Sequence, residues 1–221
     1  MNTMHFITDI LFPPLLEGFG VTLRLIIYSA PLGFITGILI AVGRVYGNKL
    51  ISTFCFLYTL FFRGAPLLVQ LFILYFALPS IGLYLSSFAA AVIGFILCSA
   101  AYHSEYIRGA IQSIKSGQMM AAEALGMSKI QAVLSIILPQ ALRRAIPGCS
   151  NEIIYLVKYS SLAYMVACVE LTGAGKVIAS RYFEYTLVFS IVGIIYLIMT
   201  SVVTIGLNSL ERKMEIPGIG K

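Results

Sequence analysis

Residues 64–104 contain no Asp, Glu, Lys or Arg, and this uncharged stretch limits what the chain can fold into. A transmembrane helix needs roughly 20 mostly apolar residues, so the stretch is too long for one span. The composition agrees, because 59% of the residues are hydrophobic and 11% are charged, whereas soluble domains carry about 25% charged residues. A soluble fold could not cover this apolar surface. We therefore predict an all-α integral membrane protein.

Five segments are long and apolar enough to cross a bilayer. Within the uncharged stretch, Pro79, Gly82, Ser86 and Ser87 are turn-forming residues that separate two spans. The fourth segment is the weakest candidate because it contains Lys158. The five predicted transmembrane helices are residues 21–43, 51–78, 87–106, 152–169 and 185–210.

Basic and charge-poor connections alternate along the chain. The second connection carries no charge, and the fourth balances Lys176 and Arg181 against Glu170 and Glu184. The first connection, the third connection and the tail are basic, so the positive-inside rule places the N-terminus outside and the C-terminus in the cytoplasm. The basic residues of these three parts are Arg44, Lys49, Arg108, Lys115, Lys129, Arg143, Arg144, Arg212, Lys213 and Lys221.

This topology predicts one transmembrane domain at residues 21–210, between an extracytoplasmic segment at 1–20 and a cytoplasmic tail at 211–221. No Lys or Arg precedes the first apolar run, and Asp9 and Glu17 are found there instead. A cleavable signal peptide begins with basic residues. We therefore expect the first span to remain in the membrane.

The long third connection, residues 113–147, is too polar to span lipid and too regular for a plain loop. Its first part is rich in the helix formers Met, Ala, Glu and Leu, and Gly126 follows where a helix would end. Ser128 and Gln131 form the pattern of a capping box that starts a second helix, and Pro139 should bend or interrupt that helix. The residues alone allow either an ordinary surface hairpin or a handle for a soluble motor.

Several motifs of the chain resemble one family of proteins. Ala121, Ala122, Gly126, Leu138 and Pro139 fit the loop signature E-A-A-x3-G-x9-I-x-L-P of the permeases of binding-protein-dependent ABC importers. The surrounding motifs are similar to the branch of that family that handles histidine, arginine, glutamine, glutamate and opines. They lie at residues 20–23, 62–71, 101–109, 113–118, 138–143, 151–152, 158–162 and 170–171.

This resemblance implies the type I ABC importer permease fold in the bacterial inner membrane, with the third connection as a cytoplasmic coupling helix for an ATPase. One departure is Met120, which stands where the family signature has glutamate, although Glu123 can present a carboxylate on the same helical face. The residues that the resemblance assigns to the ATPase-coupling loop are Gly117, Gln118, Met120, Ala121, Ala122, Glu123, Gly126, Leu138 and Pro139.

Polar residues within predicted spans are costly in lipid and tend to face the protein interior or a water-filled path. Glu152 can meet the ammonium group of a solute, or it can serve as a carboxylate at a helix start. Lys158 can bind a carboxylate or hold the following serines, and Arg63 can line the path or pin the bend beside it. At the cytoplasmic edge, Glu105 and Arg108 are expected to pair. The candidates for the solute path are Arg63, Gln70, Cys98, Glu152, Lys158 and Ser161; Cys98 is a second departure, because many relatives have asparagine there.

The chain has no G-x-x-x-x-G-K-[ST] phosphate loop and no nucleophile, base and orienting residue in a catalytic pattern. We expect a non-catalytic subunit without cofactor or metal, whose partner ATPase uses the ATP and Mg²⁺. The four cysteines are expected to be packing residues, and His103 has no partner at a metal-binding spacing. By resemblance, the partners are two ATPase subunits, a second permease chain, identical or related, and an extracytoplasmic amino-acid-binding protein, with no nucleic acid.

The predicted function is the import of polar amino acids by alternating access, driven by ATP. Three alternatives are a permease for another solute, a passive channel or carrier, and a membrane-embedded enzyme. A passive channel or carrier would give uptake that survives depletion of ATP. An enzyme should show His, Asp or Glu clustered at one depth, and the spans lack such a cluster.

Overall fold

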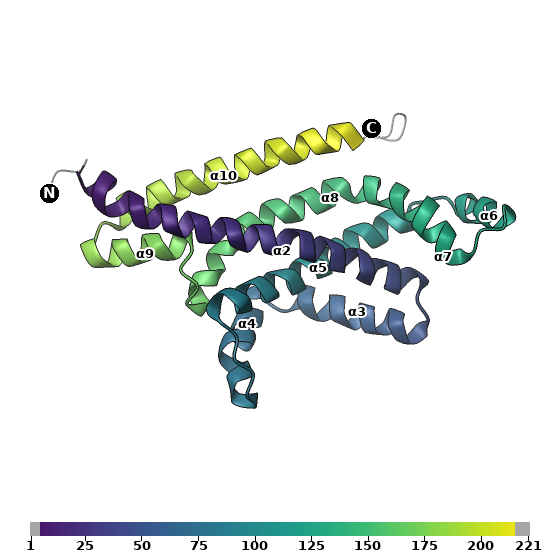
Figure 1. Ribbon diagram of the computed structural model, residues 1–221, viewed down its shortest axis with the longest axis horizontal. Coiled ribbons are helices and arrows are strands. Elements are labelled where there is room, and N and C mark those ends of the chain that lie inside the picture. The colour runs from purple at the N-terminus through teal and green to yellow at the C-terminus, as the bar shows by residue number, and fades with distance from the viewer. Residues whose placement is uncertain (1–4, 215–221) are drawn as a thin grey trace.

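A computed structural model describes residues 5–214, and its regular elements over that range are all helices (Figure 1). The predicted all-α fold is thus confirmed for the described part of the chain, and residues 1–4 and 215–221, which belong to the predicted terminal segments, lie outside it. The elements are η1 (Phe6–Leu11), α2 (Phe12–Tyr46), α3 (Lys49–Gly64), α4 (Leu67–Phe72), η2 (Ile73–Ala77), η3 (Leu78–Ile81), α5 (Ser87–Gln112), α6 (Ser116–Ala124), α7 (Lys129–Ala132), η4 (Val133–Ile137), α8 (Leu138–Tyr159), η5 (Ser160–Val166), α9 (Leu171–Tyr182) and α10 (Tyr185–Met214).

Three helices of the described chain are long and apolar enough to cross a membrane alone: Phe6–Tyr46, Ser87–Gln112 and Tyr185–Met214. The first has 41 residues and is therefore roughly 60 Å long, about twice the thickness of the hydrocarbon core. It begins well before the predicted start at residue 21. The starts predicted at residues 87 and 185 are confirmed. The number of spans becomes five if each of two bent helix pairs counts as one.

The first bent pair falls within the predicted span 51–78. Helix α3 ends at Gly64, and the helical turns that follow from Leu67 point away at 104°. Pro66 lacks a backbone N–H and restricts the residue before it to extended conformations, which ends the helix there. The side-chain nitrogen of Gln70, Nε2, donates hydrogen bonds to the carbonyls of Phe62 (3.0 Å) and Ala65 (2.9 Å). Gln70 therefore bonds the carbonyls at the bend, a role that the sequence left open for Arg63.

The second bent pair contains most of the predicted span 152–169. The helix runs without a break from Lys129 to Val166, and α9 continues after a 53° bend. The helix therefore begins before the predicted span, and the end of that span reaches into the break. The first half of α8 is amphipathic: Arg143 is exposed, while Ala141 and Ala145 are buried.

Glu170 lies at this second bend and is completely buried, although the sequence indicated only that it contributes to the charge balance of the fourth connection. Its carboxylate accepts hydrogen bonds from the backbone N–H groups of Thr172 (2.8 Å) and Gly173 (2.9 Å) and from the Tyr196 hydroxyl (2.8 Å). Thr22 Oγ1 accepts a further bond from the N–H of Leu171 (3.2 Å). These contacts join the start of α9 to α10 and to α2.

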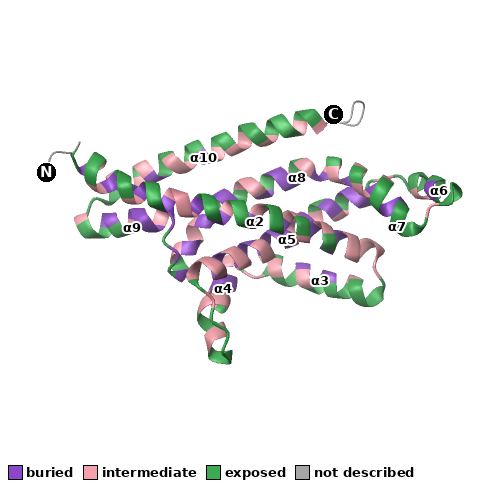
Figure 2. Cartoon of the chain, in the orientation of Figure 1, coloured by how far each residue is buried: buried purple, intermediate pink, exposed green. Residues whose placement is uncertain are grey.

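Helix α5 is the most buried of the long helices, and α2 lies along it (Figure 2). Small residues allow the close approach: a Cβ atom added at Gly37 would lie 2.6 Å from the Cβ of His103, and one added at Gly33 would lie 2.6 Å from Ser99 Oγ. The ring of Phe34 packs edge-on against His103, with centroids 5.5 Å apart. The pair of α2 and α5 is thus the centre around which the other helices pack.

The connections that carry most of the basic residues lie at one end of the helices (Figure 1). At that end are the turn between α2 and α3, the segment from α6 to α7, and the end of α10, whereas α9 lies at the other. This common end agrees with the alternation on which the predicted orientation depends.

The close approach of α2 and α5 predicts that Gly37→Ala destabilises the protein, because the new methyl group overlaps His103. Overpacking of this kind costs about 1–3 kcal/mol, and thermal unfolding of the purified protein in detergent measures it. Gly206→Ala in α10 is the matched control, since nothing lies within 4 Å of a Cβ added there. Equal melting temperatures for the two variants would contradict the close packing.

Candidate functional site

The third connection contains the short helix that the sequence predicts. Helix α6 spans Ser116–Ala124, and Gly126 follows it with a φ of 82°, a left-handed conformation that suits glycine. Ser128 and Gln131 form the predicted capping box at the start of α7. The α-helical pattern that starts with α7 changes to a π-helical turn at Val133–Ile137, just before Pro139. Pro139 itself lies in the first turn of α8, where a proline is tolerated, so it does not end that helix.

One face of α6 is held against the protein and the other is free. Ala122 is buried, and Met119 packs against a cluster of buried residues that includes Ile137 and Ala141. On the outer face, Met120 and Leu125 are 62% and 84% exposed, and Glu123 is exposed beside them. A short helix that presents large apolar side chains and a carboxylate to its surroundings is suited to contact another protein. Met120, the departure from the family signature, lies on this outer face.

Two polar contacts join α8 to the start of α6 and to the residues just before it. Gln140 Nε2 donates a hydrogen bond to Gln118 Oε1 (3.3 Å). Arg144 Nη1 donates to both the carbonyl oxygen (2.7 Å) and the hydroxyl of Ser113 (2.9 Å), just before α6 begins. Gln140, Arg144 and Glu152 all belong to α8, so the helix that contacts the segment around α6 also carries Glu152.

A cluster of arginines surrounds Glu105 on α5. Arg108 binds this carboxylate through Nε (3.2 Å) and Nη2 (2.9 Å), which confirms the predicted pair. Arg44 from α2 also binds it, and Arg63 Nη1 from α3 lies 3.7 Å away. Three guanidinium groups around one carboxylate leave an excess of positive charge. The side chain of Arg63 is the most exposed of the three, and its guanidinium lies 5.2 Å from the ring centroid of Tyr102.

Glu152 is 3% exposed and lies at the centre of a second polar group. The Tyr159 hydroxyl donates a hydrogen bond to its carboxylate (2.7 Å). Electrostatic interactions also link Glu152 to Cys98, Tyr102 and Arg63, so this group adjoins the arginine cluster. This neighbourhood thus holds a buried carboxylate, Glu152, and a guanidinium, Arg63, which packs on the ring of Tyr102.

The six predicted path residues therefore separate into two sets. Arg63 and Cys98 each interact electrostatically with Glu152, although the three residues belong to three helices. Lys158 does not join them, because its ammonium is exposed and lies 4.4 Å from the ring centroid of Tyr155. The remaining two bond to the backbone: Gln70 at the bend after α3, and Ser161 to the carbonyl of Lys158 (2.8 Å). Arg44 and Tyr159 also belong to these clusters, and no sequence pattern predicted them there.

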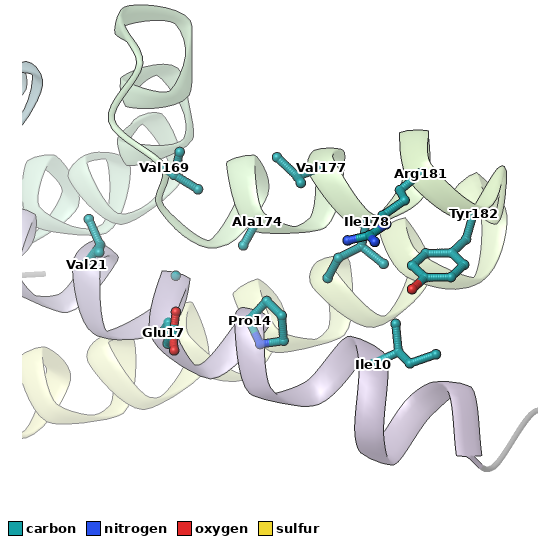
Figure 3. A pocket seen from close by; sticks show the side chains of 11 residues that line it. Ile10, Pro14, Glu17, Val21, Val169, Ala174, Val177, Ile178, Arg181 and Tyr182 are labelled. Carbon is teal, nitrogen blue, oxygen red and sulfur yellow. The ribbon is translucent and has the colours of Figure 1, made fainter.

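A separate pocket of about 340 Å³ lies between the N-terminal half of α2 and α9 (Figure 3). Its wall is mostly apolar, and Glu17 and Arg181 are its charged residues. It contains none of the predicted site residues and lies at the end of the helices away from α6 (Figure 1).

Comparisons with known proteins agree with this architecture. The model of a family described as the inner membrane component of binding-protein-dependent transport systems matches residues 31–216. A probable amino-acid ABC transporter permease protein of Bacillus subtilis, YckA, is 41% identical over 91% of this chain and 89% of its own. A putative glutamine transport system permease protein of Rickettsia typhi, GlnP, is 39% identical over 96% of this chain and 97% of its own.

A solved structure shares the fold. In the crystal structure of an amino acid ABC transporter with histidines, one chain superimposes with a TM-score of 0.84 and 32% sequence identity. The match covers 96% of this chain and 97% of that one. The expected fold, that of a type I ABC importer permease, is thereby confirmed.

Proposed function

We propose how this chain works from one premise: it belongs to the family of inner membrane components of binding-protein-dependent transport systems. It is the permease subunit of an amino-acid ABC importer and a multi-pass protein of the inner membrane. Such a permease is a transport subunit that works with a separate ATPase and with a substrate-binding protein. The proposal concerns the contacts through which ATP hydrolysis moves a solute.

The coupling helix is α6, and it docks on the ATPase subunit. The observation that carries this proposal is the combination of a buried inner face at Ala122 with an outer face that exposes Met120, Glu123 and Leu125. The remaining predicted residues of this loop shape the helix and its return: Gly117, Gln118 and Ala121 in α6, Gly126 at its end, and Leu138 and Pro139 at the start of α8. With the basic end of the protein in the cytoplasm, α6 faces the compartment that contains ATP.

ATP-driven movement of the ATPase subunits displaces α6, and the contacts of Gln140 and Arg144 pass this displacement to α8. Since α8 carries Glu152, the polar path between α3, α5 and α8 changes its access from one side of the membrane to the other. The path is completed by a second permease chain, identical or related, so that two permeases act with two ATPase subunits. This chain itself needs no cofactor for these steps.

The solute is a polar amino acid in its zwitterionic form. Its ammonium group binds Glu152, and its carboxylate binds Arg63, whose guanidinium is exposed beside Tyr102. The relative named for glutamine transport agrees with this class of solute. Cys98, which interacts electrostatically with Glu152, contacts the remainder of the solute, where its small thiol leaves more room than an asparagine would. Lys158 and Ser161 lie outside this contact in the described conformation.

Deletion of residues 118–126 should give a folded permease that no longer captures the ATPase, because it removes the docking face of α6. Co-purification of the ATPase from the membrane measures the capture, and size-exclusion chromatography checks the fold. Met120→Glu, which introduces the carboxylate of the family signature, is the matched variant and should keep the ATPase. Retention of the ATPase by the deletion variant would refute the docking role.

Glu152→Gln should abolish most of the uptake, because it keeps the size of the side chain but removes the charge that binds the ammonium group. Loss of a hydrogen bond to a charged group lowers affinity by roughly 10- to 100-fold, which is measured as amino-acid uptake into vesicles containing the assembled transporter. Glu184→Gln, which alters an exposed carboxylate before α10, is the control. Normal uptake by Glu152→Gln with the ATPase still bound would contradict the proposed site.

A further inference from the structure

A groove lies where α7 and η4 meet the turn between α2 and α3. Its volume is about 250 Å³. The wall is mostly apolar and includes side chains from all three parts of the chain, among them Val42, Tyr46, Ile51, Lys129, Ile130 and Leu134. Ile130 and Leu134 are 72% and 56% exposed, one helical turn apart, and Ile51 is also exposed. None of the residues assigned to the solute path or to the docking face of α6 lines this groove.

The groove lies beside the ends of two helices that belong to candidate membrane spans, and we therefore place it at the boundary between lipid and water. Helix α2 ends at Tyr46, and α3 begins at Lys49. At this level, large exposed apolar side chains face the head-group ends of acyl chains rather than bulk water. Tyr46 belongs to the residue type that is enriched at the interface, where its ring is apolar and its hydroxyl is hydrated.

Positive charge is concentrated at the same place. The ammonium of Lys129 lies 5.7 Å from the ring centroid of Tyr46 in the groove wall. Lys49 begins α3 two residues before Ile51. Neither lysine forms an ion pair within residues 5–214, in contrast to Arg44 nearby, which is bound to Glu105. Two cations without carboxylate partners above an apolar groove complement a ligand with an anionic head and an apolar tail.

We propose that the groove binds an anionic glycerophospholipid of the cytoplasmic leaflet. The phosphate of the lipid binds Lys49 and Lys129, and an acyl chain lies against Ile51, Ile130 and Leu134. Basic pockets between membrane helices at the cytoplasmic side are suited to such head groups. The proposal depends on the orientation given under the proposed function. Helix α7 begins the continuous helix that carries Gln140, Arg144 and Glu152. The bound lipid therefore stabilises the position of the same helix that α6 displaces.

The test is retention of lipid by the assembled transporter, purified from membranes that contain phosphatidylethanolamine, phosphatidylglycerol and cardiolipin. Native mass spectrometry measures the anionic lipid that stays bound. The double variant Lys49→Gln, Lys129→Gln should lose it, since each lysine contributes about fivefold in affinity. Lys176→Gln in α9, at the other end of the helices, is the matched control and should retain it. If the double variant fails to fold, lipid retention is compared between the single variant Lys129→Gln and the conservative variant Lys129→Arg. Lys129→Arg keeps the positive charge and should retain more anionic lipid than Lys129→Gln.

Equal retention by the double variant and the unaltered protein would overturn the proposal, as would equal loss in Lys176→Gln. Retention of the ATPase by the double variant separates this result from a failure of the docking role of α6. A second measurement distinguishes a protein occupant from lipid. The cysteine of an Ile130→Cys variant should react less with a thiol reagent in anionic vesicles, even without the ATPase. If this protection from labelling requires the ATPase, the groove belongs to the interface with that subunit and the lipid site is refuted.

Discussion

The backbone of a membrane protein must satisfy its hydrogen bonds within the protein, because lipid offers none, and this constraint governs both bends of the fold. The helix that ends at Gly64 leaves carbonyl groups without helical partners, and Gln70 from the next helix binds two of them. The start of α9 leaves N–H groups free, and Glu170 and Thr22 bind them. Each bend is therefore fixed in direction by a buried side chain, which allows helices to leave the bundle axis without exposing polar backbone to lipid.

This fixed frame gives α8 a distinctive position in the molecule. Its first half is amphipathic and contacts the segment around α6, and its second half carries Glu152 among the residues proposed to meet the solute. Energy from a soluble ATPase must cross from water into the membrane, and a single helix that is polar at one end and buried at the other can transmit a displacement over that distance. The close packing of α2 against α5 provides a rigid support for the proposed movement of α8.

Local signals in the sequence predicted much of this arrangement. The turn before Ser87, the glycine after α6 and the capping box at Ser128 depend on neighbouring residues, and all three are present. The partners of Glu105 were predicted only in part: Arg108 is three residues away, whereas Arg44 is separated by 61 residues. The helix that contains the predicted fourth span begins earlier, at Lys129, because polar residues such as Arg143 and Arg144 hid the helical pattern of its first half. The burial of Glu170 was not predicted, because it follows from tertiary contacts that no local pattern reveals.

The proposed coupling of ATP hydrolysis to transport requires that α6 lie at the cytoplasmic face, where the ATPase can bind it. A membrane-impermeant thiol reagent applied to Met120→Cys tests this directly, because the four natural cysteines are buried and should react little. We predict labelling in inside-out vesicles stripped of the ATPase, protection when the ATPase is restored, and no labelling in right-side-out vesicles. Labelling from the outer side would contradict the orientation, the docking role of α6 and the proposed transmission of movement to Glu152.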